Sequence, residues 1–335
     1  THKGGIMLKL DSTRLGLFAV SATFLASIAS AHAVELRILN SWNEKAPLTK
    51  LVSNGFVEKL KNASNGRIKI VVSGPEVIAP FEQLQPVSSG SFDFLFTHAA
   101  YHFGSKGLGV TLDSLKSNPE LRRKSGIWDI VDKYYQKQNN VKLIGVFPFG
   151  QYHFILKEGL SAKGDWAGRK IRGTKPYHSA IKSLGGSPVV LKGGEIYSAL
   201  EKGVIDGAAW PNSGALNFKW YEVAKVRVRP SFGSSSLLIL MNLDKFKSLN
   251  KADRDIILEV GRKHELAVDR ESAQISKDED VQLDKLGMTI EKLSPANYKK
   301  VSSSFNDTLW IFGKVCCGEI SEKIRKIALE SGLLK

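Results

Sequence analysis

The sequence predicts an α/β protein in which parallel sheets are flanked by helices. Strand-like apolar segments alternate with helix-like amphipathic segments along residues 34–210. The 335 residues are 42% hydrophobic and 24% charged, a balance typical of a globular chain with core enough for roughly two domains. Extended disorder is therefore excluded.

The first elements follow the order strand, helix, strand. Residues 34–42, VELRILNSW, alternate as a strand, and residues 47–64 have the apolar spacing of an amphipathic helix. The turn at Asn65 and Gly66 then leads into a second strand at 67–74, RIKIVVSG.

The middle of the chain continues with strands. Pro86 limits any helix in residues 81–90. Residues 92–101, FDFLFTHAAY, form a compact apolar strand that runs into a loop, and residues 141–150 and 152–157 are again strand-like.

After GDWAGRKIRG (164–173), helices and strands alternate. Residues 176–186 predict a helix that begins at a proline and ends at paired glycines. Residues 187–191 predict a short strand, residues 194–203 a helix and residues 204–210, VIDGAAW, another strand. This alternation favours parallel sheets flanked by helices.

Residues 250–286 differ from the rest of the chain. They contain no proline, and Asn250 can cap a helix that starts there. One continuous helix of this length would reach about 55 Å, more than one small domain spans, so it would cross from one domain to another. A break near Gly261 is the alternative.

Residues 1–33 predict an export signal after an upstream extension, THKGGI. Lys9 and Arg14 precede the apolar run LGLFAVSATFLASIAS, and the small residues AHA precede Val34. The run is short for a spanning helix. We therefore expect a periplasmic mature protein that starts near Val34, with a retained membrane anchor as the alternative.

The charge indicates anionic small ligands rather than nucleic acid. The predicted leader holds three basic residues and one acidic residue, so its removal lowers the formal charge from +15 to +13. No segment contains five consecutive lysines or arginines. Dispersed charge favours solubility and mild attraction of anions, and no nucleic-acid partner is expected.

The two cysteines, Cys316 and Cys317, are adjacent. A ring between neighbours is strained and rare, so we expect no disulfide framework but two small buried apolar residues on a C-terminal helix. Their redox state stays open.

Common catalytic motifs are absent: the lipase GxSxG, the Walker loop, HExxH and CxxC pairs. Ser179 and Lys182 form an isolated SxxK pattern that indicates no catalysis. His98 and His102 are four residues apart, but no third metal ligand lies nearby in the sequence. We expect no catalytic residues, no cofactor and no metal.

Polar and aromatic residues instead gather where the predicted strands end, the edge at which open α/β sheets bind ligands. These residues are Trp42, His98, Gln151, Tyr152, Arg172 and Trp210. An arginine offers two parallel donors that match a carboxylate, and tryptophan and tyrosine offer large apolar faces. A surface ion pair is the alternative role for Arg172.

Three segments resemble the solute-binding proteins of tripartite ATP-independent periplasmic (TRAP) transporters, of the C4-dicarboxylate-binding (DctP) type. They are WAGRKIR (166–172), GGSPVVL (185–191) and GEIYSALEKGVIDGAAWP (194–211), in the family's order and spacing. The resemblance extends over the whole mature chain.

The resemblance implies a two-lobe periplasmic binding protein fold with crossing strands and a long helix spanning both lobes. Lobe I is expected to comprise residues 34–150 and 238–279, and lobe II residues 151–237 and 280–335. Residues 1–33 form the extension and leader.

The resemblance also implies site residues. In the family, the arginine of the KIR segment binds the substrate carboxylate. In this chain that arginine is Arg172. About twenty residues earlier, Tyr152 and Gln151 stand where relatives often have a second polar or cationic contact, so two arginines holding a dianion are not expected. At the end of the strand at 204–210 some relatives have Glu-Trp with a bound cation, whereas this chain has Ala209 and Trp210. Ala209 cannot bind a metal, so no cation bridge is expected, and Trp210 is expected to form an apolar wall against the ligand. Trp42, His98, Tyr101 and Asn212 complete the predicted ligand-binding set.

The predicted function is that of an extracytoplasmic solute-binding protein, not an enzyme. It would capture an organic acid, a monocarboxylate with an apolar or aromatic body, and deliver it to TRAP membrane permease subunits. A secreted α/β hydrolase or isomerase acting on a carboxylic acid, an adhesive protein and a chemosensory binding module are the alternatives.

Overall fold

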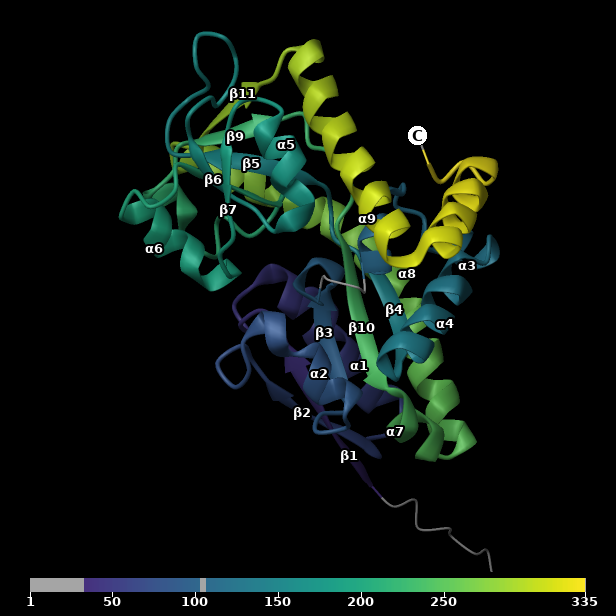
Figure 1. The fold of residues 1–335 in the computed structure, drawn as a ribbon. Helices are drawn as coiled ribbons and strands as arrows, with labels where there is room; N and C mark the ends of the chain where they lie inside the picture. Colours follow the sequence, from purple (N-terminus) through teal and green to yellow (C-terminus); the bar gives the residue numbers. More distant parts are fainter. Residues whose placement is uncertain (1–32, 103–106, 335) are drawn as a thin grey trace, which may run out of the picture. The chain divides into compact units, whose positions relative to one another are not determined.

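The computed structural model describes residues 33–102 and 107–334, so all of the predicted leader except Ala33 lies outside the described residues. The described chain forms two mixed β-sheets with helices packed against them (Figure 1). This arrangement confirms the predicted α/β class. No helix in the described part is both long and apolar enough to cross a membrane.

The first sheet has the strand order β2-β1-β3-β10-β4. Its strands are β1 (Val34–Asn40), β2 (Ile68–Ser73), β3 (Phe94–His98), β4 (Val141–Pro148) and β10 (Ser236–Asn242). The helices that accompany it are α1 (Gly55–Ala63), α2 (Leu84–Ser88), α3 (Pro119–Lys124), α4 (Ile127–Asn139) and α7 (Leu243–Ser248). Of these elements, α3, α4, α7 and β10 were not predicted from the sequence.

The second sheet has the strand order β11-β9-β5-β8-β6-β7. Its strands are β5 (Tyr152–Leu156), β6 (Lys170–Arg172), β7 (Ser187–Val189), β8 (Gly207–Pro211), β9 (Val226–Arg229) and β11 (Thr289–Lys292). The predicted helices appear as α5 (His178–Lys182) and α6 (Ile196–Glu201), each entered through a short 3-10 turn.

The expectation of purely parallel sheets is wrong in one respect. In the first sheet β10 pairs antiparallel with β3 and β4, and in the second sheet β5 pairs antiparallel with β8 and β9. The chain reaches β5 directly from β4 of the first sheet, and it reaches β10 directly from β9 of the second. Each reversed strand therefore enters its sheet from the other sheet rather than through a crossover helix.

The strands β3, β4, β5, β8 and β10 are buried on both faces. In β4, Leu143 and Ile144 point to opposite faces and belong to two different apolar clusters, one containing residues of α4 and the other residues of α1 and α8. In β5, Phe154 and Ile155 are divided between the same two clusters. Continuous apolar strands such as VKLIGVFP and YHFIL follow from this burial.

The long helix α8 (Lys251–Lys285) is continuous over 35 residues, so the predicted helix is confirmed and the break near Gly261 does not occur. The Asn250 side chain accepts a hydrogen bond from the Asp253 backbone nitrogen, as expected for an N-cap. The helix contacts both sheets. Glu265 accepts a hydrogen bond from the backbone of β4, and Asp280 pairs with Arg227 of β9.

The C-terminal helix α9 (Pro295–Glu330) contains a kink at Gly318, where φ is 27°. Cys316 and Cys317, directly before the kink, form a disulfide and are half-buried. The expectation of two buried thiols is therefore wrong. The expectation assumed a regular helix, in which neighbouring side chains diverge by about 100°, and the chain leaves helical geometry at the next residue.

The chain passes between the sheets at Phe149–Gln151, at Pro230–Ser235 and along α8. Helix α9 packs against α5 and also against the 3-10 segment Gly107–Ser114 that follows β3. The predicted lobe boundaries, which also assign residues 280–335 to the second lobe, stay a prediction.

Candidate functional site

The candidate site is a cavity lined from both sheets by residues at strand ends. Six of the eight predicted ligand-binding residues line it: Trp42, His98, Tyr101, Tyr152, Arg172 and Trp210. Strand ends bring them together, since His98 ends β3, Arg172 ends β6 and Tyr152 begins β5. The free volume is about 30 Å³, which is room for a few water molecules at most.

Arg172 is buried, with 1% of its surface exposed. Its Nε donates to the Leu191 carbonyl oxygen at 3.0 Å and its Nη1 donates to the Ala209 carbonyl oxygen at 3.1 Å. Nη2 has no hydrogen-bond partner among the described residues. Two main-chain carbonyls thus hold the guanidinium in one orientation and leave donors available.

No carboxylate of the described chain forms an ion pair with Arg172, although other buried arginines, such as Arg227, have acidic partners. The Trp210 ring lies 5.2 Å from the guanidinium carbon and supplies a cation-π contact. A buried cation without a counter-ion is costly, so an anion bound beside Arg172 would be stabilised.

Trp42 and Tyr101 form one aromatic wall. The Trp42 Nε1 donates to the Tyr101 hydroxyl at 3.0 Å, and the ring centroids are 5.2 Å apart. Burial raises the pKa of Tyr101, and the positive charge of Arg172 opposes this shift. The phenol therefore stays protonated close to the guanidinium.

Trp210 forms a second wall, and it packs edge-on against Trp220 and Phe218. Gly193 lies so close that a Cβ there would be 2.7 Å from the Trp210 ring. The glycine in the 3-10 turn before α6 therefore permits the close approach of the backbone to the indole.

A buried polar network of His98, Asp113 and Tyr152 borders the cavity. The His98 Nε2 lies 2.9 Å from Asp113 Oδ2, and the Tyr152 hydroxyl donates to the same oxygen at 2.8 Å. Burial, and secondarily the charge of Asp113, raises the pKa of Tyr152 well above its usual range. His98 lines the cavity, and its hydrogen bond with Asp113 fixes the orientation of its ring.

Gln151 and Asn212 do not reach the cavity. Their backbones are joined by a hydrogen bond from the Asn212 nitrogen to the Gln151 carbonyl oxygen at 2.8 Å. The Asn212 side chain accepts from the Gln151 nitrogen and from the Ser276 hydroxyl of α8. Gln151 lies in the connection between β4 and β5 and Asn212 directly follows β8, and their proposed contact with a ligand has no geometric support.

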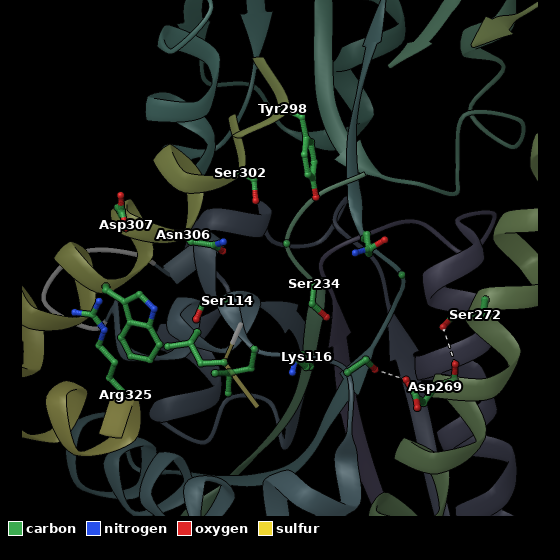
Figure 2. Close-up of a pocket in the computed structure, with 18 residues that line it drawn as sticks. Ser114, Lys116, Ser234, Asp269, Ser272, Tyr298, Ser302, Asn306, Asp307 and Arg325 are labelled. Carbon is green, nitrogen blue, oxygen red and sulfur yellow. Dashed lines mark hydrogen bonds between the residues drawn. The ribbon is translucent and has the colours of Figure 1, made fainter. Parts of the chain in front are cut away.

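Gln151 instead lines a separate and larger cavity of about 640 Å³. Figure 2 shows Tyr298, Ser302, Asn306 and Asp307 of α9 on one side of it, and Asp269 and Ser272 of α8 on the other. Its charges are mixed, because Lys116 and Arg325 line it together with two aspartates. We base the candidate site on chemistry rather than size, since only the smaller cavity brings a buried, unpaired cation together with aromatic walls.

Several further residues line the site that the sequence pattern had not indicated. The missed lining residues are Leu48, Thr174, Tyr177, Pro211, Ser235 and Leu237. Thr174 and Tyr177 lie two and five residues after Arg172, so their place after a predicted strand was an available signal. Ser235 precedes β10, a strand that had not been anticipated, and Asp113 lies in a 3-10 segment with no sequence signal.

His102 also lies outside the cavity, and its Nε2 is 2.7 Å from the Tyr135 hydroxyl. Within residues 33–102 and 107–334, no three His, Cys, Asp or Glu side chains are grouped to hold a metal ion.

The model of one protein family, described as "DctP: Bacterial extracellular solute-binding protein, family 7", matches residues 39–310. Among curated proteins, the chain is 26% identical over 230 residues to the outer membrane transporter protein TsaT of Comamonas testosteroni, a match that covers 63% of this chain and 65% of TsaT. The matches span 65% or less of the length of the first curated relatives.

Solved structures show the same fold. A TRAP periplasmic solute-binding protein from Desulfovibrio salexigens with bound orotic acid has a TM-score of 0.78 and 20% identity, covering 89% of this chain and 98% of that one. A marine metagenome TRAP solute-binding protein specific for aromatic acid ligands, in complex with 3-hydroxybenzoate, has a TM-score of 0.77 and 22% identity, covering 90% and 98%.

Proposed function

Because this chain belongs to the DctP family of TRAP transporter solute-binding proteins, bacterial extracellular solute-binding protein family 7, we propose that it captures an organic acid outside the cytoplasm and delivers it to TRAP membrane permease subunits. The proposal includes export to the periplasm through the predicted leader. It describes binding and release, with the acid left chemically unchanged.

The observation that carries the proposal is the state of Arg172. Its guanidinium is buried, held by two carbonyl oxygens, and without an acidic partner in the described chain. A ligand carboxylate would accept charge-assisted hydrogen bonds from the remaining donors, Nη2 among them. Such an ion pair offsets the cost of burying the cation, so the site favours anions over neutral solutes.

The walls support an acid with one carboxylate and an apolar or aromatic body. Trp42, Tyr101, Tyr177 and Trp210 supply flat apolar surface around the guanidinium. Arg172 is the only arginine or lysine among the described residues that line the cavity, so a second carboxylate would lack a cationic partner there. The two structural relatives, described with orotic acid and 3-hydroxybenzoate, also bind acids.

Capture requires a conformational change, because the cavity has room for only a few water molecules. A solute of several heavy atoms enters only if the walls from the two sheets separate. Gly150 and Gly233 lie in the two strand connections between the sheets, with φ of 69° and 59°. These connections are suited to act as hinges, since glycine adopts such φ values without strain. Ligand contacts with both sheets would then favour the closed state.

A thermal-shift screen of residues 34–335 tests the proposal. The panel contains keto, hydroxy, aromatic, sugar and dicarboxylic acids, with neutral amides of the same acids as controls, and the protein is first freed of co-purified ligand. Binding to the folded state alone stabilises by about 2.7 kcal/mol at a hundred times the dissociation constant. We expect a shift with a monocarboxylate and none with its amide, and we expect mass spectrometry to recover the acid unchanged. Failure of every acid to raise the midpoint would refute the proposal.

Delivery has a separate test. Uptake of the acid that binds, in proteoliposomes containing the permease subunits, should require this protein. Uptake that proceeds equally well without it would refute the delivery role while leaving acid binding intact.

A further inference from the structure

A second polar group of the cavity bears on which acid fits, and the inference drawn from it rests on the proposed function. Tyr152 lines the same cavity as Arg172, and its hydroxyl belongs to the network with His98 and Asp113. The protons in this network determine what the cavity offers to a ligand.

The protons of His98 are assigned from its hydrogen bonds. The Ala100 backbone nitrogen donates to His98 Nδ1 at 3.1 Å, so Nδ1 is an acceptor and carries no proton. The ring proton therefore resides on Nε2, directed at Asp113 Oδ2. In this arrangement His98 is neutral and adds no positive charge to the cavity.

Asp113 is a buried carboxylate that accepts from neutral donors only. His98 Nε2 and the Tyr152 hydroxyl donate to Oδ2, and the Ser236 backbone nitrogen donates to Oδ1 at 3.0 Å. Within the described chain no lysine or arginine forms an ion pair with it. Its negative charge is therefore not neutralised by a direct ion pair with a lysine or arginine, although the buried Arg122 interacts with it electrostatically.

The Tyr152 hydroxyl donates its one proton to Asp113. Its oxygen can then act towards the cavity only as an acceptor. Burial raises the pKa of both Tyr152 and Tyr177 well above the usual range, and the negative charge of Asp113 is the second-largest cause of the increase in each. The Tyr152 side of the cavity is thus negative and accepts hydrogen bonds, whereas Arg172 donates them.

We propose that the site selects a monoanionic acid carrying a hydroxyl or N–H donor away from its carboxylate, with Tyr152 accepting that donor and Asp113 positioning Tyr152. A ligand with a second carboxylate is rejected, because that group brings a negative charge next to Asp113 and has no proton to donate. A ligand with hydrogen in place of the hydroxyl leaves the Tyr152 oxygen without the hydrogen bond it would otherwise accept from the ligand.

Two matched sets of three acids test this selection by isothermal titration calorimetry. One set is 3-hydroxybenzoate, benzoate and isophthalate, and the other is 4-hydroxybutyrate, butyrate and succinate. Within the set whose body fits, the hydroxy acid should bind at least about tenfold more tightly than its two analogues, since buried polar groups left unpaired discriminate strongly.

The Tyr152→Phe variant should lower this preference over the unsubstituted acid to about twofold or less, measured as the ratio of the two affinities within the same variant. Tyr197→Phe, which removes a phenol bonded to Glu222 outside the cavity, should keep the full preference. Asp113→Asn should reduce the discrimination against the dianion, because it removes the charge but keeps an oxygen for Ser236. If the asparagine variant does not fold, the Tyr152→Phe ratio alone decides.

The outcomes separate the two proposals. Equal or tighter binding of the unsubstituted acid or the dianion by the wild-type protein, or an unchanged preference in Tyr152→Phe, overturns the inference but leaves acid capture by Arg172 standing. If none of the six acids binds and the wider panel also gives no shift, the proposed function fails and the inference fails with it. If only the wider panel binds, the same comparison is made between the acid found and its analogue lacking the donor, and equal affinity overturns the inference.

Discussion

Replacing Arg172 by alanine should abolish tight acid binding while leaving the fold intact. The side chain is 1% exposed, so a ligand carboxylate paired with it is shielded from solvent. Truncating one partner of a buried hydrogen-bonded charge pair costs about 2 to 5 kcal/mol. This range corresponds to a loss of about thirtyfold to several thousandfold in affinity.

The stability of the ligand-free variant should change much less. Arg172→Ala removes two hydrogen bonds to carbonyl oxygens and the contact with Trp210, each worth about 1 kcal/mol. It also removes the cost of burying a cation without an acidic partner, which acts in the opposite direction. We therefore expect the melting temperature of ligand-free Arg172→Ala to lie within a few degrees of that of the ligand-free wild type. Residues that bind ligands commonly lower the stability of the folded protein, so replacing them often costs little stability.

Calorimetric titration of both proteins with the acid found in the screen measures the effect, and Arg325→Ala serves as the matched control. Arg325 is also a cation beside a tryptophan, 5.7 Å from the Trp310 ring centroid, but it lines the larger cavity. The control should bind the acid as the wild type does. Affinity within threefold of the wild type in Arg172→Ala, or a loss confined to Arg325→Ala, would show that the acid binds elsewhere.

Three further predictions concern the scaffold. Burial, and secondarily the charge of a neighbouring lysine, lowers the pKa of His264 to about 4 in the folded protein. As the pH falls, the histidine of the unfolded chain is therefore protonated before that of the folded protein, and the free energy of unfolding should fall by up to about 3 kcal/mol from pH 6.5 to 4. Urea unfolding of His264→Gln should show a smaller decrease over the same pH range. Gly261→Ala would place a Cβ 2.5 Å from a carbonyl oxygen of β4 and should lower the free energy of unfolding by about 1 to 3 kcal/mol. The control Gly194→Ala, which has open space around it, should not lower it. Equal unfolding midpoints of the two variants in denaturant would contradict the packing argument. Asn250→Ala removes the cap that accepts from the Asp253 nitrogen and should cost about 1 kcal/mol in the same assay, and no change would show that the cap is dispensable.

Local pattern sufficed for the elements whose stability is local. The alternation in β1, the apolar runs of β3 and β4 and the capped, proline-free helix α8 were all predicted at nearly their observed bounds. The pattern did not disclose β10, because a short apolar segment such as SLLILMN has no periodicity that separates a strand from a buried helix. It also could not show that β5 and β10 run against their neighbours, since strand direction depends on which sheet the chain has just left.

The sequence could predict those cavity residues that lie in the cavity because they stand at the end of a strand. Arg172, His98 and Tyr152 fulfil this condition, and they meet in one cavity. Gln151 is one residue before Tyr152 and Asn212 is two residues after Trp210, yet they contact each other and α8 instead. Successive residues of extended chain point in opposite directions, so a shift of one residue from Tyr152 moves the Gln151 side chain out of the cavity, whereas Asn212 lies beyond the end of β8.

The sequence by itself determined the α/β class, the long helix and the presence of an arginine among aromatic residues at strand ends, because these depend on composition and on neighbours along the chain. Only the tertiary structure decided that Arg172 lacks an acidic partner, that Asp113 lies behind His98 and Tyr152, and that Cys316 and Cys317 are joined beside a kink. These features join segments far apart in sequence or depend on a local break in geometry. Charge and proton position in the cavity follow from such contacts, and with them the kind of acid we expect it to bind.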